Sequence, residues 1–268
     1  MSIKKTPLGK NSDFPLIYDP SVLTPLSRLD SRTKAGLEEY TSQFEGRDYW
    51  TSYETSWLNE KGIPRNKILN LSYSSQSQFF IESKSLKLYL YSLNDKEFRS
   101  TEEVQAQIKE DLENSLKTEV IVELENKPRK IEETFTSIDS ENLDKIDSHP
   151  LSLSIEPEEE ADVAEELSTS LFRSLCPVTS QPDWATIYIR YKGNKINHKS
   201  LLKYLLSYRN HQGFHEECVE RIFSDILQRI RIDELFVRAN FLRRGGIEIN
   251  PVRVTPGNSP EIIREIRQ

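Results

Sequence analysis

The sequence predicts an α+β protein made of two similar halves, and three observations lead to this prediction. Short runs of alternating apolar and polar residues indicate β-strands, and longer runs with apolar residues every three or four positions indicate helices. These runs follow the same order, strands then helices then strands, on both sides of an acidic segment. Few residues are identical between the halves, so we predict a duplication of element order rather than of sequence.

In the first half, the predicted elements lie between residues 67 and 125. KILNLSY, which starts at Lys67, alternates as a strand does, and QFFIES has the apolar content of a second strand. SKSLKLYLYSL is predicted to be helical. Ser100 and Glu103 have the spacing of a capping box, which predicts a second helix, and TEVIVELE after it is predicted to be a strand. The apolar stripe of this second helix consists of Val104, Ile108, Leu112 and Leu116.

In the second half, ATIYIRY is predicted to be a strand, and SLLKYLLSYR and HEECVERIFSDILQRI to be helices. LFVRANFLRR and GIEINPVRV flank Gly245 and Gly246, which is the signal of a hairpin. The segment that precedes Ser174 is predicted to be helical. The apolar face of the longer helix consists of Val219, Ile222, Phe223, Ile226, Leu227 and Ile230.

The formal net charge of −7 is unevenly distributed. Residues 131–166 contain thirteen Asp or Glu and one Lys, a balance of −12, so the rest of the chain carries about +5 (−7 minus −12). An acidic chain is not expected to bind polynucleotides, which requires clustered positive charge. We expect an N-terminal arm (1–45), a first module (46–130), an acidic connecting segment (131–166) and a second module (167–268).

The composition, with 36% hydrophobic and 29% charged residues, is typical of a soluble globular protein. Two cysteines that lie 42 positions apart do not make a disulfide framework, and they fit a reducing compartment. The first residues lack the apolar core of a signal peptide, and no run approaches the roughly 18 apolar residues of a membrane span. We therefore expect a cytoplasmic protein.

The stretch SLCPVTSQPDW, residues 174–184, places Cys176 and Asp183 in a segment whose two prolines predict an irregular loop. A lone cysteine is most often a small buried hydrophobe, so the alternatives are core packing and a nucleophile with a proton partner. For Cys218, on the apolar side of an amphipathic helix, core packing is expected.

Three further groups of residues have both a structural and a functional interpretation. His211, His215 and Cys218 have helical spacing that metal ligands can use, but Gly213 intervenes and no fourth ligand is evident. Glu216 after His215 suits simple helix capping. The remaining candidates are Glu82 with Lys84 and Lys87 at a strand-to-helix junction, and Arg243 to Gly246, a hairpin that also suits phosphate contact.

Five blocks of the sequence, in this order, resemble one known family: YETSWLNEKGIP, IESKSLKLY, SLCPVTSQPDW, FHEECVERIF and RRGGIEINP. The family is that of the NADPH-dependent 7-cyano-7-deazaguanine reductases, the nitrile reductases of queuosine biosynthesis. The resemblance is to the long, two-module subclass, and it extends from Asp48 to the C-terminus except for the acidic middle. It implies two tunnelling-fold (T-fold) modules, each an antiparallel sheet with helices on one face. It also implies a homodimer that uses NADPH.

The same resemblance implies roles for individual residues. Cys176 would form a thioimide with the nitrile, and Asp183 would deliver protons; a carboxylate beside a thiol disfavours the thiolate, so a positive or hydrogen-bonding neighbour must oppose it. Residues implied to contact the substrate are Ile81, Glu82, Ser83, His215 and Glu216, and those implied to contact NADPH are Ser83, Lys84, Arg244 and Gly245. No resident metal, membrane or direct nucleic-acid contact is implied. Two alternatives stay open: a metal-dependent hydrolase that resembles GTP cyclohydrolase, and a non-catalytic purine-binding module.

Overall fold

The computed structural model describes residues 14–128, 135–143, 154–258 and 268 of the chain. Contacts divide these residues into two compact units. Unit 1 contains residues 14–34, 48–128 and 243–249. Unit 2 contains residues 35–47, 135–143, 154–242, 250–258 and 268. Among the described residues, no helix is long and apolar enough to span a membrane.

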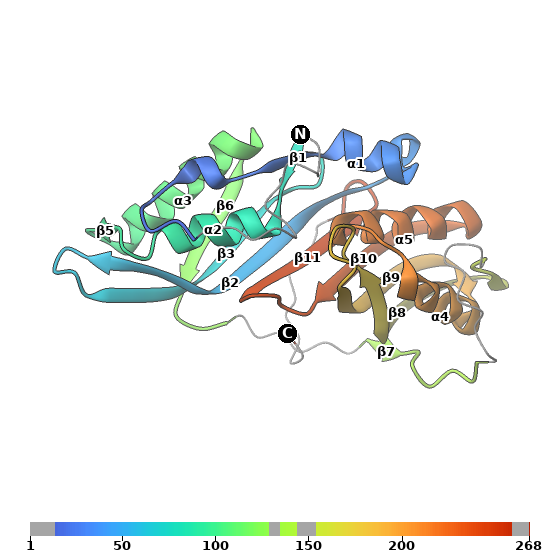
Figure 1. Ribbon diagram of the computed structural model, residues 1–268. Helices are drawn as coiled ribbons and strands as arrows, with labels where there is room; N and C mark the ends of the chain where they lie inside the picture. The colour runs from blue at the N-terminus through green and yellow to red at the C-terminus, as the bar shows by residue number, and fades with distance from the viewer. Residues whose placement is uncertain (1–13, 129–134, 144–153, 259–267) are drawn as a thin grey trace. The chain divides into compact units, whose positions relative to one another are not determined.

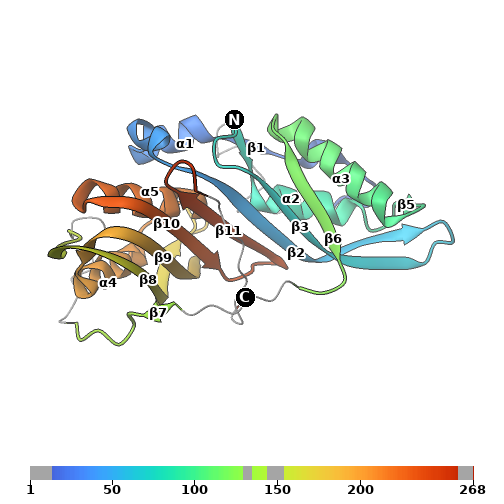
Figure 2. The ribbon, with the colours of Figure 1, turned by 180° about the vertical axis from the view of Figure 1, so that it is seen from behind.

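Unit 1 is a sheet with two main helices. Its strand order is β6-β3-β2, and β3 and β6 are antiparallel, with Leu71 opposite Val122. Figures 1 and 2 show helices α2 and α3 on the same side of β3 and β6. The bounds of these elements are β2 (Glu45–Asn59), β3 (Pro64–Ser74), α2 (Ser83–Ser92), β5 (Glu97–Phe98), α3 (Thr101–Leu116) and β6 (Val120–Glu125).

A smaller two-stranded pairing precedes helix α2 in unit 1. Strand β1 (Pro25–Ser27) runs antiparallel to β4 (Phe79–Ile81), with Pro25 opposite Ile81. Short helices flank β1 in the sequence: η2 (Pro20–Val22), α1 (Arg28–Ala35) and η3 (Glu38–Gln43). Strand β4 leads directly into α2, so the two-stranded pairing fixes where that helix begins.

Unit 2 has the same kind of architecture. Strands β8 and β9 form a long antiparallel hairpin, and β10 pairs antiparallel with both β9 and β11. Its core joins the sheet to two helices through residues such as Leu167, Ile187, Leu201 and Ile222, all almost fully buried. The elements are β7 (Thr136–Ser137), β8 (Pro157–Leu175), β9 (Pro182–Ile196), α4 (His198–Ser207), η4 (Tyr208–Asn210), α5 (His215–Arg229), β10 (Ile232–Phe241) and β11 (Ile247–Val254).

The α+β class is confirmed, and so are most predicted elements. KILNLSY lies in β3, and TEVIVELE leads into β6. Four of the five helices predicted after Ile81 are present, as α2, α3, α4 and α5. Ser100 Oγ accepts the Glu103 N–H at 3.2 Å, as the capping box predicts, although the Glu103 carboxylate returns to the N–H of Arg99 rather than to that of Ser100. Gly245 and Gly246 both have positive φ, at 56° and 85°, and lie between β10 and β11.

Three interpretations of the sequence are wrong. The segment before Ser174 is strand β8 and not a helix, and β8 begins within the acidic segment, at Pro157. Pairing with β9 outweighs the helix propensity of its Ala and Glu residues. Strand β2 was missed because polar residues occupy several buried positions, among them Ser52 and Thr55. Residues 14–45 are not an arm, since they include the buried Leu26, Leu37 and Phe44; residues 1–13, 131–134 and 144–153 lie outside the described residues.

The duplication also extends to individual residues, contrary to the expectation from the sequence. Helices α2 and α4 have the same length of 10 residues, and both begin directly after an isoleucine and a polar N-cap, Glu82 or Asn197. Each N-cap N–H donates to the carbonyl that precedes a proline, from Glu82 to Thr24 (3.1 Å) and from Asn197 to Glu156 (2.9 Å). The identical pairs are Lys84/Lys199, Ser85/Ser200, Leu86/Leu201, Tyr89/Tyr204, Leu90/Leu205 and Ser92/Ser207.

Candidate active site

Cys176 lies in a tight turn at the end of the β8–β9 hairpin in unit 2. Strand β8 ends one residue earlier, and the turn is closed by two backbone hydrogen bonds. The Cys176 N–H donates to the carbonyl of Gln181 (2.9 Å), and the Ser180 N–H donates to the carbonyl of Cys176 (3.0 Å). The Cys176 side chain is largely buried, with 7% of the residue exposed. The loop is shorter than predicted, because Pro182 already begins β9, where its missing N–H is tolerated.

Asp183 therefore stands on a strand and not in a loop. It pairs with Ser174, two residues before Cys176, so Asp183 and Cys176 lie at the same end of the hairpin. Because side chains alternate along a strand, Asp183 points to the buried face, whereas Trp184 is 38% exposed. Ser174 and Cys176 are buried in the same alternation along β8.

His215 begins helix α5 and contacts Asp183. Its Nε2 lies 3.4 Å from Oδ1 of Asp183, and both side chains are mostly buried. The imidazole stacks flat on Phe241, with ring centroids 3.7 Å apart. Its Nδ1 is buried and has no hydrogen-bond partner among the described residues. An imidazole held in this way can balance the charge of Asp183 and still offer one nitrogen to a ligand.

Glu216 follows His215 in the first turn of α5 and is 6% exposed. A carboxylate at this place benefits from the positive end of the helix dipole. The helix has no side-chain cap, since its N-cap residue is Phe214. The structure therefore places His215 and Glu216 together with Cys176 and Asp183 in unit 2.

The second thiol has a different environment. Cys218 is fully buried in the core of unit 2, as the helical pattern predicted. Burial raises the pKa of the Cys218 thiol well above its usual range, and the negative charge of Glu217 raises it further. Cys218 thus remains a protonated thiol at neutral pH and cannot serve as a nucleophile.

The metal interpretation of His211, His215 and Cys218 loses its geometric basis. His211 follows η4 and precedes α5, so the three residues do not share one helix. Within the described ranges, no group of three His, Cys, Asp or Glu residues has a geometry that could hold a metal ion.

Glu82 is the N-cap of helix α2 in unit 1. Its two carboxylate oxygens accept the N–H of Lys84 (2.6 Å) and of Ser85 (2.9 Å), and only 1% of the residue is exposed. Burial raises the pKa of Glu82, and the two N–H bonds partly oppose this. Oε1 also accepts a longer hydrogen bond from the Ser83 hydroxyl (3.4 Å), whereas Oε2 accepts from Ser85 and has a second lone pair that could accept a hydrogen bond from a ligand.

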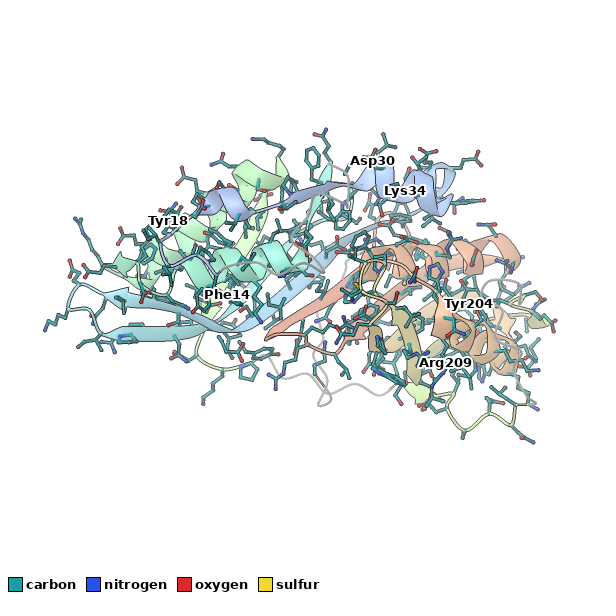
Figure 3. The ribbon with its side chains drawn as sticks, viewed as in Figure 1. Phe14, Tyr18, Asp30, Lys34, Tyr204 and Arg209 are labelled. Atoms are coloured by element: carbon teal, nitrogen blue, oxygen red, sulfur yellow. The ribbon has the colours of Figure 1, made fainter. Side chains whose placement is uncertain are left out.

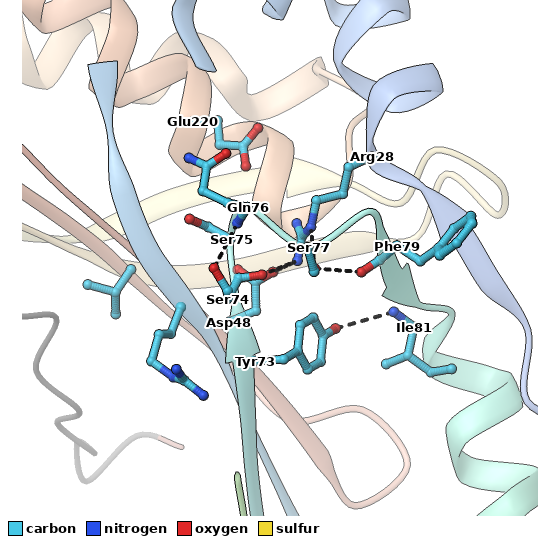
Figure 4. A network of polar contacts seen from close by, with 12 residues as sticks. Arg28, Asp48, Tyr73, Ser74, Ser75, Gln76, Ser77, Phe79, Ile81 and Glu220 are labelled. Atoms are coloured by element: carbon cyan, nitrogen blue, oxygen red, sulfur yellow. Dashed lines mark hydrogen bonds and ion pairs between the residues drawn. The ribbon is translucent and has the colours of Figure 1, made fainter. Parts of the chain in front are cut away.

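The backbone before Glu82 is fixed by polar contacts, which Figure 4 shows. The Ile81 N–H donates to the phenol of Tyr73 (3.2 Å), and Ser77 Oγ donates to the carbonyl of Phe79 (2.7 Å). The buried Arg28 donates to Ser77 Oγ (3.0 Å) and pairs with the buried carboxylate of Asp48. These contacts hold the junction that carries Ile81, Glu82 and Ser83.

The turn with Arg244 and Gly245 lies in unit 1 and contacts helix α2. Arg244 and Ile247 form an antiparallel bridge across it, and a Cβ added at Gly245 would overlap Nζ of Lys87. The Lys87 ammonium thus lies against the exposed backbone of the glycine turn. On the other side of the turn, the carboxylate of Glu54 lies against Gly246.

Lys87 was grouped with Glu82 and Lys84 in the sequence, but it is not among the residues that the family resemblance implies to contact NADPH. The structural interpretation of this group is a solvated helix start. The spacing of Lys87 from Lys84, three positions along a helix, places both ammonium groups on one helical face. That spacing, together with a Gly-Gly turn elsewhere in the chain, is the signal that sequence reasoning had available.

Taken together, these features define a class of protein: an α+β enzyme in which a buried cysteine lies at the same hairpin end as a carboxylate–imidazole pair. Residues 14–124 match the family model "Nitrile reductase, 7-cyano-7-deazaguanine-reductase N-term", and residues 182–259 match "QueF-like protein". The chain is similar over its whole length to the NADPH-dependent 7-cyano-7-deazaguanine reductase of Acinetobacter baumannii strain SDF, at 42% identity over 278 residues and 100% of both chains. The enzyme of the same name from Hahella chejuensis is 43% identical over 93% of each chain.

The chain belongs to the family of NADPH-dependent 7-cyano-7-deazaguanine reductases. A solved structure, the archaeosine synthase QueF-Like in its apo form, matches with a TM-score of 0.33 and 18% identity, over 38% of this chain and 100% of that chain.

Proposed function

We propose that this chain reduces the nitrile of 7-cyano-7-deazaguanine to a primary amine with NADPH, in queuosine biosynthesis, and that Cys176 is the nucleophile. The observation that carries the proposal is the pair of His215 and Asp183, with Nε2 and Oδ1 3.4 Å apart, at the hairpin end where Cys176 lies. A nitrile carbon accepts hydride poorly, so covalent activation by a thiolate is chemically sensible.

The first step forms a bond between Sγ of Cys176 and the nitrile carbon. The Sγ–H proton passes to the carboxylate of Asp183, and one π bond of the nitrile breaks with its electron pair moving to nitrogen. The nitrogen then takes this proton from Asp183 to give a thioimide. His215 stabilises Asp183 in both protonation states, because its ring can donate to the carboxylate or accept from the acid. Because Cys176 is largely buried, water has little access to the thioimide.

The later steps need a nucleophile that is also a leaving group. When bound, NADPH supplies hydride, and two equivalents account for the four electrons between nitrile and amine. After the first reduction the C–S bond breaks, the electron pair returns to sulfur, and the resulting imine is reduced to the amine. Cys176 satisfies both demands, because a thiolate attacks readily and leaves more readily than an alkoxide.

We assign the substrate's guanine-like edge to two buried carboxylates, Glu82 and Glu216. A carboxylate can accept two parallel N–H bonds from such an edge, and these charge-assisted bonds favour the ionised form. For Glu82 they would oppose the upward pKa shift that burial causes. Ile81, Ser83 and His215 are assigned supporting contacts. The buried, unpartnered Nδ1 of His215 supports this assignment.

We assign the cofactor's phosphates to Ser83, Lys84, Arg244 and Gly245, and we add Lys87. The residues fit such a group, because Gly245 has a φ of 56° and its missing Cβ leaves room for the Lys87 ammonium against the backbone. Cations beside exposed backbone N–H groups are suited to phosphate oxygens.

We further propose that the protein acts as a homodimer in the cytoplasm on a free nucleobase, without direct contact to nucleic acid. The resemblance to two-module reductases supports the dimer, and the net charge of −7 is consistent with a small-molecule substrate. Light scattering on the purified protein tests the dimer, which requires twice the mass of one chain.

The experiment that tests the function follows NADPH absorbance with 7-cyano-7-deazaguanine. We expect Cys176→Ala to lower kcat on the order of 10⁶-fold, as removal of a nucleophile does in another enzyme. Cys218→Ala is the matched control and should retain activity, because Cys218 is a buried core thiol. Mass spectrometry without NADPH should detect a substrate adduct on Cys176. Turnover by Cys176→Ala at the normal rate would overturn the covalent mechanism, and activity that depends on added zinc would favour a hydrolase.

A further inference from the structure

The strand that leads to Cys176 is tied to a second segment of unit 2, residues 211–213. The Leu175 N–H donates to the carbonyl of His211 (2.8 Å), and the Gly213 N–H donates to the carbonyl of Leu175 (3.1 Å). Leu175 is the residue directly before Cys176. Movement of the 211–213 segment would therefore move the backbone next to the nucleophile.

The same segment also holds the far end of the turn. The side-chain amide of Gln212 donates to Oγ of Ser180 (2.7 Å). Since the Ser180 N–H closes the turn on the carbonyl of Cys176, both ends of the turn depend on the 211–213 segment. Leu175 and Ser180, which the 211–213 segment contacts, have no proposed part in the reaction.

His211 anchors this segment on the core of unit 2. Its N–H donates to the carbonyl of Tyr208 (2.7 Å), and its ring packs edge-on against that of Tyr208, with centroids 5.3 Å apart. The Tyr208 hydroxyl is 2.7 Å from that of Tyr204, which is labelled in Figure 3 and is itself fully buried. The anchor is thus a set of packed aromatic rings, which resists displacement.

Glu217 links His211 to the helix that carries His215. Its Oε1 lies 3.6 Å from Nε2 of His211, and the two side chains are only 15% and 14% exposed. Both pack against Gly213, where an added Cβ would lie 2.9 Å from the His211 nitrogen and 3.2 Å from the Glu217 oxygen. Glu217 lies two residues after His215 in the first turn of α5.

We propose that His211 and Glu217 are positioning residues for Cys176, an inference that rests on the proposed function. His211 sets the turn through the bonds to Leu175, and Glu217 sets His211 against the first turn of α5. Together they fix the thiol of Cys176 relative to the Asp183–His215 pair, so that attack and proton delivery occur in one geometry. Neither side chain is assigned contact with the substrate.

The test measures the rate of adduct formation on Cys176 with 7-cyano-7-deazaguanine and no NADPH. We expect Glu217→Ala to slow this rate about 10–100-fold, the cost of a small misplacement of reacting groups, with substrate affinity changed less than about twofold. Glu217→Gln keeps the shape of the side chain and should recover most of the rate. Glu165→Ala is the matched control, because it removes the partner of another His–Glu contact in unit 2 (His198 Nε2 to Glu165 Oε2, 3.1 Å), and it should leave the rate unchanged.

A second variant and a second readout keep the two proposals separate. Gly213→Ala places a methyl group against both side chains and should slow adduct formation as Glu217→Ala does, with thermal unfolding used to select folded protein. Alkylation of Cys176 by iodoacetamide reports the position of the thiol without any substrate. If the wild-type protein forms no adduct, the proposed function is wrong. A changed rate of alkylation in both variants would still support the positioning of the Cys176 thiol by His211 and Glu217. Wild-type rates of both reactions in Glu217→Ala and Gly213→Ala would overturn the positioning role.

Discussion

The hydrogen bonds of Glu82 and its burial shift its pKa in opposite directions. As the N-cap of α2 it accepts two backbone N–H bonds, which favour the carboxylate, but its burial favours the neutral acid. Burial is the larger effect, so the pKa is raised. A ligand that donates N–H groups stabilises a buried carboxylate more than an exposed one, because its hydrogen bonds replace the water that burial has removed.

The stability of the folded protein should reveal this raised pKa. Because folding raises the pKa of Glu82, the folded state binds its proton more tightly, and the contribution to stability is fully present below the unfolded pKa of about 4.3. It is lost as the pH rises through the folded pKa. We expect the difference in free energy of unfolding between wild type and Glu82→Gln to fall from pH 4 to pH 8, measured by urea denaturation. A difference that grows with pH would contradict the assignment.

The two cysteines show how strongly the surroundings decide the role of a residue. Cys176 lies at a strand end beside an ionisable pair, whereas Cys218 is surrounded by core side chains, and its pKa is raised by burial. At the residue scale, the sequence predicted the core position of Cys218 because the helical pattern placed it on an apolar face. That pattern carried no information about the partner of Asp183, which is His215.

Helices α2 and α4 show the duplication most clearly at the scale of elements. In each, a buried serine donates to the carbonyl of the N-cap, Ser85 to Glu82 (2.7 Å) and Ser200 to Asn197 (2.9 Å). Each serine also accepts a backbone N–H from the segment before the proline, at 3.0 Å in both cases. The N-cap residues themselves differ, since α2 has Glu82 and α4 has Asn197. The carboxylate of Glu82 therefore has no counterpart at the equivalent position of α4.

This equivalence predicts matched costs for two substitutions. Ser85→Ala and Ser200→Ala each leave one backbone N–H without its partner, which costs about 1–3 kcal/mol. We expect the two variants to lose similar free energies of unfolding in urea denaturation. Ser154→Ala, an exposed control, should change stability by less than about 0.5 kcal/mol. A large loss in only one of the helix variants would show that the two hydrogen-bond sets are not energetically equivalent.

At the scale of the whole molecule, ligand binding and folding should be linked. In Cys176→Ala the substrate binds without a covalent bond, so saturation at about 100 times Kd should add about 2.7 kcal/mol to the free energy of unfolding. Calorimetry should show this as a rise in Tm. We expect Glu82→Ala and Glu216→Ala, each combined with Cys176→Ala, to diminish the rise, since each removes a proposed acceptor for the same nucleobase. An undiminished rise in either double variant would remove that residue from the substrate contacts.

The sequence by itself determined the elements that are encoded within one or two turns or one alternating run. Helices α2 to α5, the Ser100 cap of α3, the strands β3 and β6 and the glycine turn follow from local propensity, and the motif order pointed to the family. Tertiary structure alone decided the rest. Strand β8 is a strand because β9 pairs with it along most of its length, against the preference of its own residues. His215 contacts Asp183, and residues 211–213 hold the turn of Cys176, because a helix start and a hairpin end more than 30 positions apart meet in the packed core. Local periodicity reports which face of an element is buried, but not which other element buries it.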